Sequence, residues 1–441
     1  MDQQSLLERV LNAWRLPDLR RKLLYTVGIL VIFRLIAHVP IPGVNAQALR
    51  ELFRTNQMIS MLDLFSGGAM SSFSVAAMGV YPYITASIVM QLMVPLIPRL
   101  EVISKEGEGG RNKIAQYTRY LTIPLAFLQA FGQVTLLHSQ AGQAVIPNFA
   151  LNHQSTFLPS LAMLVTLTGG TMLLVWLGEL ITENGIGNGL SLIIFAGIVA
   201  RLPDLVSQTV RANVAGNSIV GPVVLILVVL AIVVGIVLIY QGERRIRVQY
   251  AKRIRGGTVT QGGGSTFIPL KVNSAGMIPL IFAASIMLFP GNVASYFQAS
   301  TVPWVQSVAT FIVGVFNTQG VVYWVLYFLL VVGFAYFYTF VTFQQQNPAE
   351  TLQKHGGFIT GIRPGRPTAE YLTRVLTRIT LLGALFLALV AIAPFFVRSV
   401  AQAQALTLSS TALLIVVGVV LDTMKQLEAQ LLMRRYQGFI K

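Results

Sequence analysis

The sequence predicts an all-α polytopic membrane protein with ten transmembrane helices, and three observations predict this fold class. The chain of 441 residues is 54% hydrophobic and only 11% charged, with a mean hydropathy of +0.68, values that soluble globular domains do not reach. Its apolar residues gather in ten stretches of about the length that crosses a bilayer. Its Lys and Arg residues collect in alternate connections between these stretches.

Residues 1–22, before the first apolar stretch, predict a cytoplasmic amphipathic segment. Leu6–Leu16 is interrupted by charged residues and has no small-residue cleavage site after it, so it is not typical of a secretory signal peptide. We expect a short helix that lies at the membrane surface and ends near Pro17.

The ten apolar stretches are interpreted as membrane spans, each close to the ~20 residues that a helix needs to cross the hydrocarbon layer. The fifth is the shortest and begins in the glycine-rich motif NGIGNG. The spans are Leu23–Val39, Gly79–Ile97, Tyr120–Leu137, Leu158–Leu177, Ile186–Ala200, Ile219–Tyr240, Phe267–Phe289, Gly320–Phe343, Leu372–Phe396 and Leu406–Met424.

The distribution of positive charge predicts that both termini lie in the cytoplasm. With the N-terminus on that side, all but six of the 32 Lys and Arg residues are cytoplasmic, so the net charge of +16 needs no nucleic acid to explain it. We expect Arg34, at the outer end of the first span, to reach the interface. A short acidic turn with Glu179 and Glu183 is cytoplasmic without positive charge of its own. The six exceptions are Arg34, Arg50, Arg54, Arg201, Arg211 and Arg398.

The count of spans permits two pseudo-symmetric inverted halves. Residues 23–200 would hold helices one to five, residues 201–424 helices six to ten, and residues 425–441 a cytoplasmic tail. An odd number of spans in each half makes the halves inverted, which places a functional site at their interface. This is an argument from parity, because no residue repeat relates the halves.

Two long cytoplasmic loops, about 242–266 and 344–371, predict docking surfaces for an anionic partner, either an acidic protein surface or RNA phosphates. In the first loop, Ile246–Tyr250 and Thr258–Thr260 are predicted to pair as strands of a projecting hairpin. In the second, prolines stiffen a loop that presents Arg363 and Arg366. A solvated loop without a partner is the alternative.

The residues argue against an enzyme. The chain has no cysteine, four widely spaced histidines and no G-x-x-x-x-G-K-[ST] motif, so no metal, cofactor or catalytic residue is predicted. The spans are nearly free of ionisable residues, which disfavours a proton-coupled transporter.

Gln91 and Asn273 are candidates for a weak hydrogen-bonded contact between helices, with ordinary helix packing as the alternative. The uncharged run Leu64–Pro98, which contains SGGAMSSFSVAAMGV, is too long for one span and too polar at its start for lipid.

Six motifs spread along the chain carry a resemblance to a known family. On these motifs the chain resembles the SecY family, the pore-forming subunits of the bacterial protein-conducting channel. The motifs are FRLIAHVPIPGV (Phe33–Val44), LFSGGAMSSFSVAAMGVYPYITASIVMQLM (Leu64–Met93), KEGEGGRNKIAQYTRY (Lys105–Tyr120), WLGELITENGIGNGLSLIIFAGIVA (Trp176–Ala200), PLKVNSAGMIPLIFA (Pro269–Ala283) and GFITGIRPGRPTAEYL (Gly357–Leu372).

The resemblance implies a channel that opens across the membrane for unfolded secretory proteins and sideways for hydrophobic helices. It implies a re-entrant plug helix at about residues 61–74, a lateral gate with Gln91 and Asn273 on its two sides, and a pore ring of aliphatic side chains that deform around a passing peptide. The implied ring is Val80, Ile84, Ile194, Ile281 and Ile415. The implied plug is Met61, Leu64, Phe65, Ser66, Gly67, Gly68, Ala69, Met70, Ser71 and Ser72.

The resemblance also implies partners and a location. The conduit would be passive, would lie in the bacterial inner (cytoplasmic) membrane, and would be driven by the SecA motor ATPase or the translating ribosome. Arg253, Arg255 and Arg363 would contact the ribosome or SecA. Further implied partners are SecE-like and SecG-like membrane subunits, signal peptides, nascent hydrophobic helices and the lipid bilayer. A secondary transporter for a small solute is the alternative from the residues alone.

Overall fold

The structure is a computed structural model of the chain, and the residues it describes are mostly helical. The described residues are 16–45, 47–49, 51, 66–141, 145–146, 149, 154–215, 220–250, 254–255, 258–259, 265–276, 278–298, 302–317, 320–401 and 410–437. The elements are α2 (Pro17–Ile36), α5 (Tyr81–Leu96), α6 (Pro98–Lys105), α7 (Glu108–Ala141), α8 (Gln154–Asn184), α9 (Gly189–Ala215), α10 (Val220–Gln241), β1 (Glu243–Tyr250), β2 (Ile254–Arg255), β3 (Thr258–Val259), β4 (Ser265–Lys271), α11 (Ile278–Phe297), α12 (Pro303–Val315), α13 (Val321–Gln346), α14 (Pro348–Lys354), β5 (Gly357–Ile359), α15 (Arg366–Ala401) and α16 (Ser410–Gln437).

Every predicted span overlaps a helix of the structure. The ten helices are α2, α5, α7, α8, α9, α10, α11, α13, α15 and α16. Among the described residues, three stretches are long and apolar enough to cross a membrane, and α5 with α6 makes a fourth if the 100° bend between them lies within one span. The three are Thr156–Asn184, Val321–Lys354 and Arg366–Ala393. Apolar helices suited to a membrane are therefore present, and the full set of ten spans stays a prediction.

The surface helix predicted to end near Pro17 falls on residues 1–15, which lie outside the described part of the chain. Pro17 itself begins α2, because proline fits the first helical position, where its missing N–H has no partner to lose. Two other predicted boundaries are wrong. Phe267–Lys271, predicted as the start of the seventh span, lies in strand β4, and α11 begins at Ile278. Helix α8 continues to Asn184, so Glu179 and Glu183 lie on a helix and not in a turn.

The chain divides into two compact units. The first contains Met1–Asn217, Phe289–Thr318 and Ile415–Lys441, and the second contains Ser218–Leu288 and Gln319–Leu414. This grouping follows contacts and is not a sequential division of the chain. The two inverted halves therefore stay a prediction.

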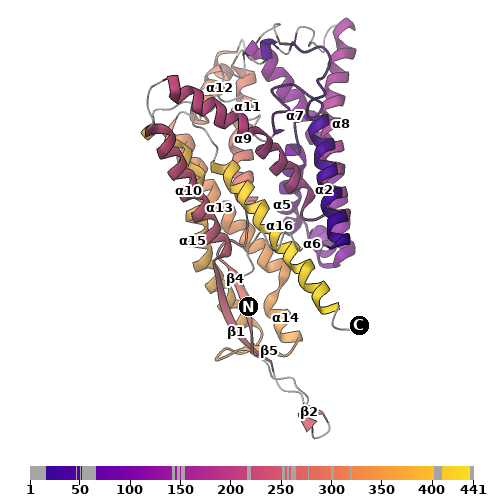
Figure 1. Cartoon of the computed structure of the whole chain (residues 1–441), viewed down its shortest axis with the longest axis vertical. Coiled ribbons are helices and arrows are strands. Elements are labelled where there is room, and N and C mark those ends of the chain that lie inside the picture. The colour runs from indigo at the N-terminus through magenta and orange to yellow at the C-terminus, as the bar shows by residue number, and fades with distance from the viewer. Residues whose placement is uncertain are drawn as a thin grey trace. The chain divides into compact units, whose positions relative to one another are not determined.

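In the first unit, α7 packs on α5 and on α8, and α8 also packs on α2 and α9 (Figure 1). The motif NGIGNG makes the tight connection from α8 to α9. There the N–H of Ile186 donates to Thr26 Oγ1 of α2 at 3.3 Å, and Ile186 joins Leu19 and Leu427 in a small buried cluster. This connection positions α9 against α2.

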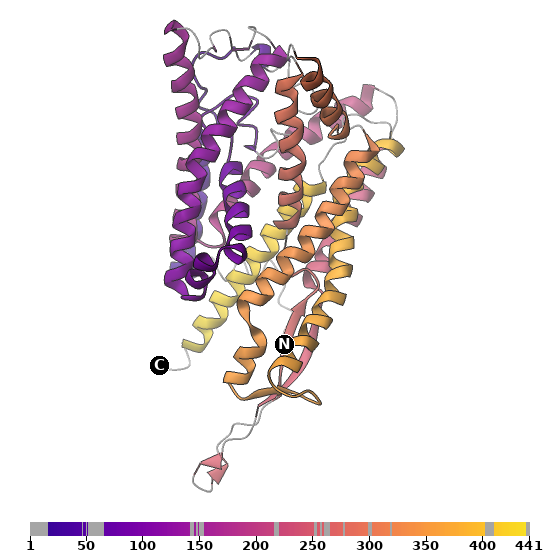
Figure 2. The same cartoon turned by 180° about the vertical axis from the view of Figure 1, so that it is seen from behind.

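In the second unit, α13 and α15 lie side by side along their length, with α10 also packed on α15 (Figure 2). A three-stranded antiparallel sheet of order β4-β1-β5 follows α10 in the chain. Its apolar side chains pack with those of α14 and α15 in a cluster of Ile246, Val248, Leu270, Leu352, Ile359 and Leu372. The sheet thus has its own core beside the helices.

The predicted pairing of Ile246–Tyr250 with Thr258–Thr260 is wrong. Strand β1 pairs with β4, Glu243 opposite Lys271, and with β5, Val248 opposite Ile359. Thr258–Val259 pairs instead with Ile254–Arg255 as the separate sheet β2-β3. The longer β4 offers β1 an alternating set of apolar side chains, and burying Ile246 and Val248 on one face selects this register.

Candidate functional site

The uncharged run after α2 enters the first unit as a series of turns, which we call the turn segment (Ser66–Val80). Ser66 is helical, and Gly67–Val80 form consecutive turns with one β-bridge at Ser74. The predicted plug helix is therefore absent from Gly67 to Ser74, and its first residues, Met61, Leu64 and Phe65, lie outside the described part of the chain.

Serine hydroxyls add to the main-chain hydrogen bonds that the turn segment makes within itself, such as the one from the N–H of Ser74 to the Ala69 carbonyl at 2.9 Å. The N–H of Met70 donates to Ser66 Oγ at 3.1 Å, and Ser71 Oγ donates to the carbonyl of Gly68 at 2.9 Å. Ser72 Oγ donates to the Ala69 carbonyl at 3.2 Å and lies 3.3 Å from the Ala37 carbonyl. Non-helical backbone surrounded by apolar helices must find its partners within the protein. This requirement explains why the run is too polar for lipid.

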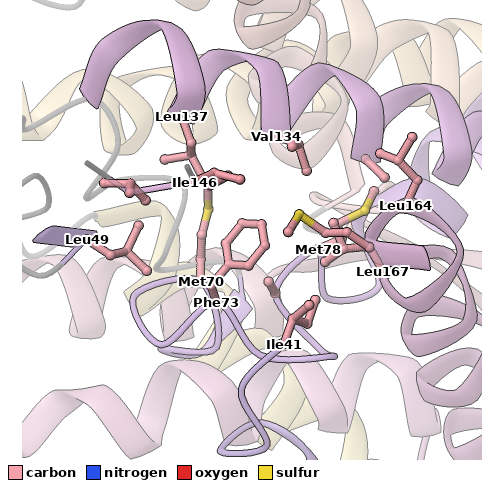
Figure 3. Close-up of a cluster of buried hydrophobic side chains, with 14 of the residues drawn as sticks. Ile41, Leu49, Met70, Phe73, Met78, Val134, Leu137, Ile146, Leu164 and Leu167 are labelled. Atoms are coloured by element: carbon pink, nitrogen blue, oxygen red, sulfur yellow. The ribbon is translucent and has the colours of Figure 1, made fainter. Parts of the chain in front are cut away.

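Apolar side chains of the turn segment pack into the first unit. Met70 and Phe73 are each 1% exposed and point toward Val134 and Leu137 of α7 (Figure 3). Ile41, from the chain after α2, closes the same cluster. The central part of the turn segment is thus a component of the core of this unit and not a surface loop.

Backbone hydrogen bonds tie the second part of the turn segment to the chain after α2. The N–H of Ile41 donates to the Phe73 carbonyl at 3.0 Å, and the N–H of Val75 donates to the Val39 carbonyl at 3.0 Å. Together they form a bridge between Pro40 and Ser74. Phe73–Val75 is therefore fixed through its main chain, independently of its side chains.

Gly197 of α9 and Gly170 of α8 let the turn segment approach these two helices closely. Gly67 has φ 67°, and a side chain placed on it would collide with the Cα of Gly197 on α9. Likewise, a side chain on Gly170 of α8 would collide with the carbonyl of Val75. Glycine is required here because backbone packs directly against backbone and because φ is positive at Gly67.

Two arginines reach the first part of the turn segment. Arg34 Nη1, near the end of α2, donates to the Gly67 carbonyl at 2.9 Å. Arg201 Nη2, on α9, donates to Ser71 Oγ at 3.2 Å. The Arg201 side chain also lies against Gly68, where a Cβ, if one were added, would be 3.2 Å from Arg201 Nε. Arg34 was expected to reach the interface, and in the structure it is half-buried against the turn segment. Charged donors at such places form stronger hydrogen bonds than neutral ones.

The predicted pore-ring residues lie within helices of the structure or, for Val80, directly before one. Val80 is the N-cap of α5, and the N–H of Ile84 donates to its carbonyl at 3.1 Å. Val80, Ile194 of α9 and Ile415 of α16 are buried, and Ile84 is half-buried. These four belong to the first unit, whereas the half-buried Ile281 of α11 belongs to the second. A ring that includes Ile281 stays a prediction.

The two predicted gate residues belong to different units. Gln91 lies on α5 in the first unit and donates to Ser87 Oγ at 3.3 Å, one turn away. Asn273 lies in the second unit, is 8% exposed, and donates to the Gly276 carbonyl at 3.0 Å. Each amide is therefore bonded locally, and a contact between them stays a prediction.

The predicted docking arginines are described only in part. Arg363 is exposed, and its carbonyl accepts a hydrogen bond from Thr368 Oγ1 at 2.8 Å, which fixes the backbone just before α15. Arg255 belongs to β2, and Arg253 lies outside the described residues. Arg366 forms an exposed ion pair with Glu370 at 3.1 Å.

Sequence reasoning did not find several residues that the structure brings to the site or near it. Arg201 was noted only as one of the six positive charges outside the cytoplasmic connections, and the glycines at 170 and 197 were given no role. The available signal was the arginine itself, because a charge beside an apolar helix is costly unless it has a role. The positive partner of Glu179 was missed as well: Arg119 of α7 binds it, with Nε 2.5 Å from Oε1. Both partners of that pair come from helices distant in sequence.

Comparisons with known proteins agree over nearly the whole chain. A family model described as SecY matches residues 74–424. A curated relative from Halalkalibacterium halodurans, named protein translocase subunit SecY, is 46% identical over 98% of this chain and 99% of its own. One of the same name from Bacillus subtilis is 42% identical over 98% of both chains.

Solved structures agree in fold. A protein-conducting channel matches with a TM-score of 0.61 at 16% identity, covering 97% of both chains. Sec61 in a canine ribosome-channel complex from the endoplasmic reticulum matches with a TM-score of 0.58 at 15% identity, again over 97% of both chains. The family is one of membrane translocase subunits and not of enzymes, which agrees with the apolar helices of the structure. The chain belongs to the SecY family of protein translocase subunits.

Proposed function

We propose that the chain is the central pore-forming subunit of a bacterial protein translocase. It conducts unfolded secretory proteins across the inner membrane and releases hydrophobic helices sideways into lipid. The observation that carries this proposal is the match to curated translocase subunits over almost the full length of both proteins. The excess of Lys and Arg in alternate connections supports ten spans with both termini in the cytoplasm.

In this proposal the turn segment is the resting plug of the pore. Its support is physical: irregular, polar backbone inside a set of apolar helices needs protein or a water-filled cavity around it. The aliphatic side chains of Val80, Ile84, Ile194, Ile281 and Ile415 form the ring that the plug covers. Narrow aliphatic rings lose water readily and hold no ion. A gate between Gln91 and Asn273 opens toward lipid.

The proposed partners follow from the same family and from the charge of the second unit. SecE-like and SecG-like subunits complete the channel in the membrane. Arg253, Arg255 and Arg363 bind the ribosome or the SecA motor, which supply the driving energy because the chain has no phosphate-binding loop of its own. Signal peptides and nascent apolar helices pass through the gate.

Reconstitution tests the proposed function directly. The chain with SecE-like and SecG-like subunits is placed in vesicles, and SecA, ATP and an unfolded preprotein are added. We expect the preprotein to become resistant to external protease only when ATP is present. Uptake of a small solute without any ATP-dependent protection would overturn the channel proposal in favour of a transporter.

The plug is tested separately. Deleting residues 61–72 should raise the resting ion conductance of planar bilayers by at least about tenfold, because an open narrow pore conducts and a filled one does not. Thermal unfolding in detergent should remain cooperative, since Phe73–Val75 keeps its own backbone bonds. Unchanged conductance would count against a sealing role for these residues.

A further inference from the structure

The turn segment is attached in two chemically different ways along its length. From Phe73 to Val75 it is tied by main-chain hydrogen bonds to Val39 and Ile41. From Gly67 to Ser71 it is instead reached by charged side chains from two helices. The partners of a main-chain bridge cannot be exchanged without rearranging both backbone segments. A side-chain donor, by contrast, can turn to another acceptor or to water.

We propose that Arg34 and Arg201 form a clamp that holds Gly67–Ser71 in its resting place, and that release of this clamp is the first step when the segment moves. The inference rests on the proposed plug function, and it adds which residues control the plug. Arg34 binds from α2 and Arg201 from α9, two helices that pack together in the first unit. The clamp therefore holds the segment from two elements at once.

The geometry favours a positioning role for both arginines. The acceptors, the Gly67 carbonyl and Ser71 Oγ, lie four residues apart within one turn region. Gly67 and Gly68 both have positive φ, at 67° and 89°, and the aliphatic stem of Arg201 lies against Gly68. Both arginine residues are half-buried, so they retain some access to water. A clamp of this kind can be released because a water-filled pore can hydrate a guanidinium that has lost its carbonyl.

The other end of the moving part is marked by an unusual backbone. Phe73 has φ 43°, a left-handed conformation that a bulky residue rarely adopts, and it stands directly before the fixed bridge at Ser74. Strained non-glycine residues of this kind gather at switch regions. The clamp and this joint enclose Gly67–Ser72 between them, with Met70 as the apolar anchor that must leave its cluster.

A buried reporter tests the clamp without relying on export. The chain has no cysteine, so Ala69→Cys introduces a single thiol into it at a position that is 0% exposed. The complex with cysteine-free SecE-like and SecG-like subunits is reconstituted, and labelling by a water-soluble maleimide is timed. Arg34→Gln and Arg201→Gln, each combined with the reporter, should label several-fold faster than the reporter alone. Arg111→Gln, which removes one exposed positive charge on α7, should not change the rate.

Milder variants cover the case in which a glutamine variant fails to assemble. Ser71→Ala removes the acceptor of Arg201 together with the hydroxyl's own hydrogen bond to the Gly68 carbonyl, and Arg34→Lys keeps the charge with a single donor group. Both should give intermediate labelling rates. Labelling that is unchanged in all clamp variants, or a lowered unfolding temperature without faster labelling, would overturn the clamp and assign these arginines a merely structural role.

Resting conductance separates the clamp from the function on which it rests. If labelling and conductance rise together, both the clamp and the plug are supported. If labelling rises while conductance does not, the clamp is retained and the sealing role of the segment is overturned. If deletion of residues 61–72 opens the channel but no clamp variant changes labelling, the plug is retained and the clamp is rejected.

Discussion

The turn segment and the β4-β1-β5 sheet are both interruptions of an otherwise helical chain, and they satisfy the hydrogen bonds of their backbones in different ways. In the sheet, β1 exchanges hydrogen bonds with β4 and β5 in regular register. In the turn segment, local main-chain bonds of single turns, serine hydroxyls, two arginines and one β-bridge supply the partners. In a β-ladder each residue is bonded main chain to main chain, so the bonds hold together as a set. A hydrogen bond from a side chain can be broken or replaced without changing its neighbours.

This difference teaches where the molecule can change its shape. The sheet buries Ile246 and Val248 under α14 and α15 and presents Arg244 and Arg245 to solvent, which suits a rigid docking surface. The turn segment packs on glycines and on charged side chains that water can replace. We therefore expect substitutions in the turn segment to alter the resting leak of ions. Substitutions in the predicted docking loops, about 242–266 and 344–371, should instead alter motor-driven export.

The largest effect is expected from Gly67→Ala. The positive φ costs an alanine about 1 kcal/mol, and the collision with Gly197 on α9 adds about 1–3 kcal/mol of overpacking. The turn segment should leave its place, so resting conductance should rise in planar bilayers and the unfolding temperature in detergent should fall.

Gly43→Ala is the matched control for that variant. Gly43 has φ 92° but no atom within 4 Å of an added Cβ, so it shares the cost of positive φ without the collision. It should lower stability by only about 1 kcal/mol and leave conductance unchanged. Equal leak in both variants would mean that backbone conformation, and not close packing on α9, seats the turn segment.

The next effect is expected from Val248→Ala in the sheet. Val248 is 0% exposed within the cluster between β1, α14 and α15, so losing its methyl groups should cost about 2 kcal/mol of stability. Arg244→Ala, on the exposed face of the same strand, should leave the unfolding temperature nearly unchanged. Resting conductance should stay at its wild-type value in both. A leak in the Val248 variant would break the separation of the two regions.

The sequence predicted the helical elements well because their signal is local. Ten apolar stretches mark ten helices, since apolar runs of this length and composition have few other stable forms. The limits of the elements were less predictable. Phe267–Lys271 is apolar enough to extend a span, yet it is β-branched and aromatic in part and finds a partner strand in Glu243–Tyr250. Pairing with a distant strand decided its structure, and no local pattern contains that information.

The site was less predictable for the same reason. The resemblance implied a plug at about residues 61–74, which stays a prediction, and polarity alone indicated that the start of the run does not face lipid. The contacts that hold this segment come from residues 34, 197 and 201, which are separated from it by tens of residues or more. An arginine such as Arg34 can reach an interface or a carbonyl with the same side chain, so only the folded chain decides between them.

A smaller effect on stability, with a selective effect on function, is expected from Arg363→Glu. The side chain is exposed, so reversal of its charge should change the unfolding temperature little. Export driven by SecA and ATP should fall several-fold, because an anionic partner would meet a like charge. Arg363→Gln should give an intermediate loss. Protease protection in vesicles measures the export, and conductance should remain unchanged; a leak here would contradict the assignment of docking to this loop.

The smallest effect on stability is expected from breaking the ion pair between Arg119 and Glu179. Here an arginine of the first unit binds a carboxylate away from the turn segment, whereas Arg34 and Arg201 bind the turn segment itself. The side chain of Arg119 is 45% exposed and that of Glu179 is 24% exposed, so water screens their attraction. A double-mutant cycle of Arg119→Gln and Glu179→Gln, followed by thermal unfolding in detergent, should give a coupling below about 1 kcal/mol. Conductance should not change in any of these variants, in contrast to Arg34→Gln. If breaking this pair increased leak as much as Arg34→Gln does, then loss of any arginine contact in the first unit would loosen the turn segment, and its particular acceptors at Gly67 and Ser71 would not matter.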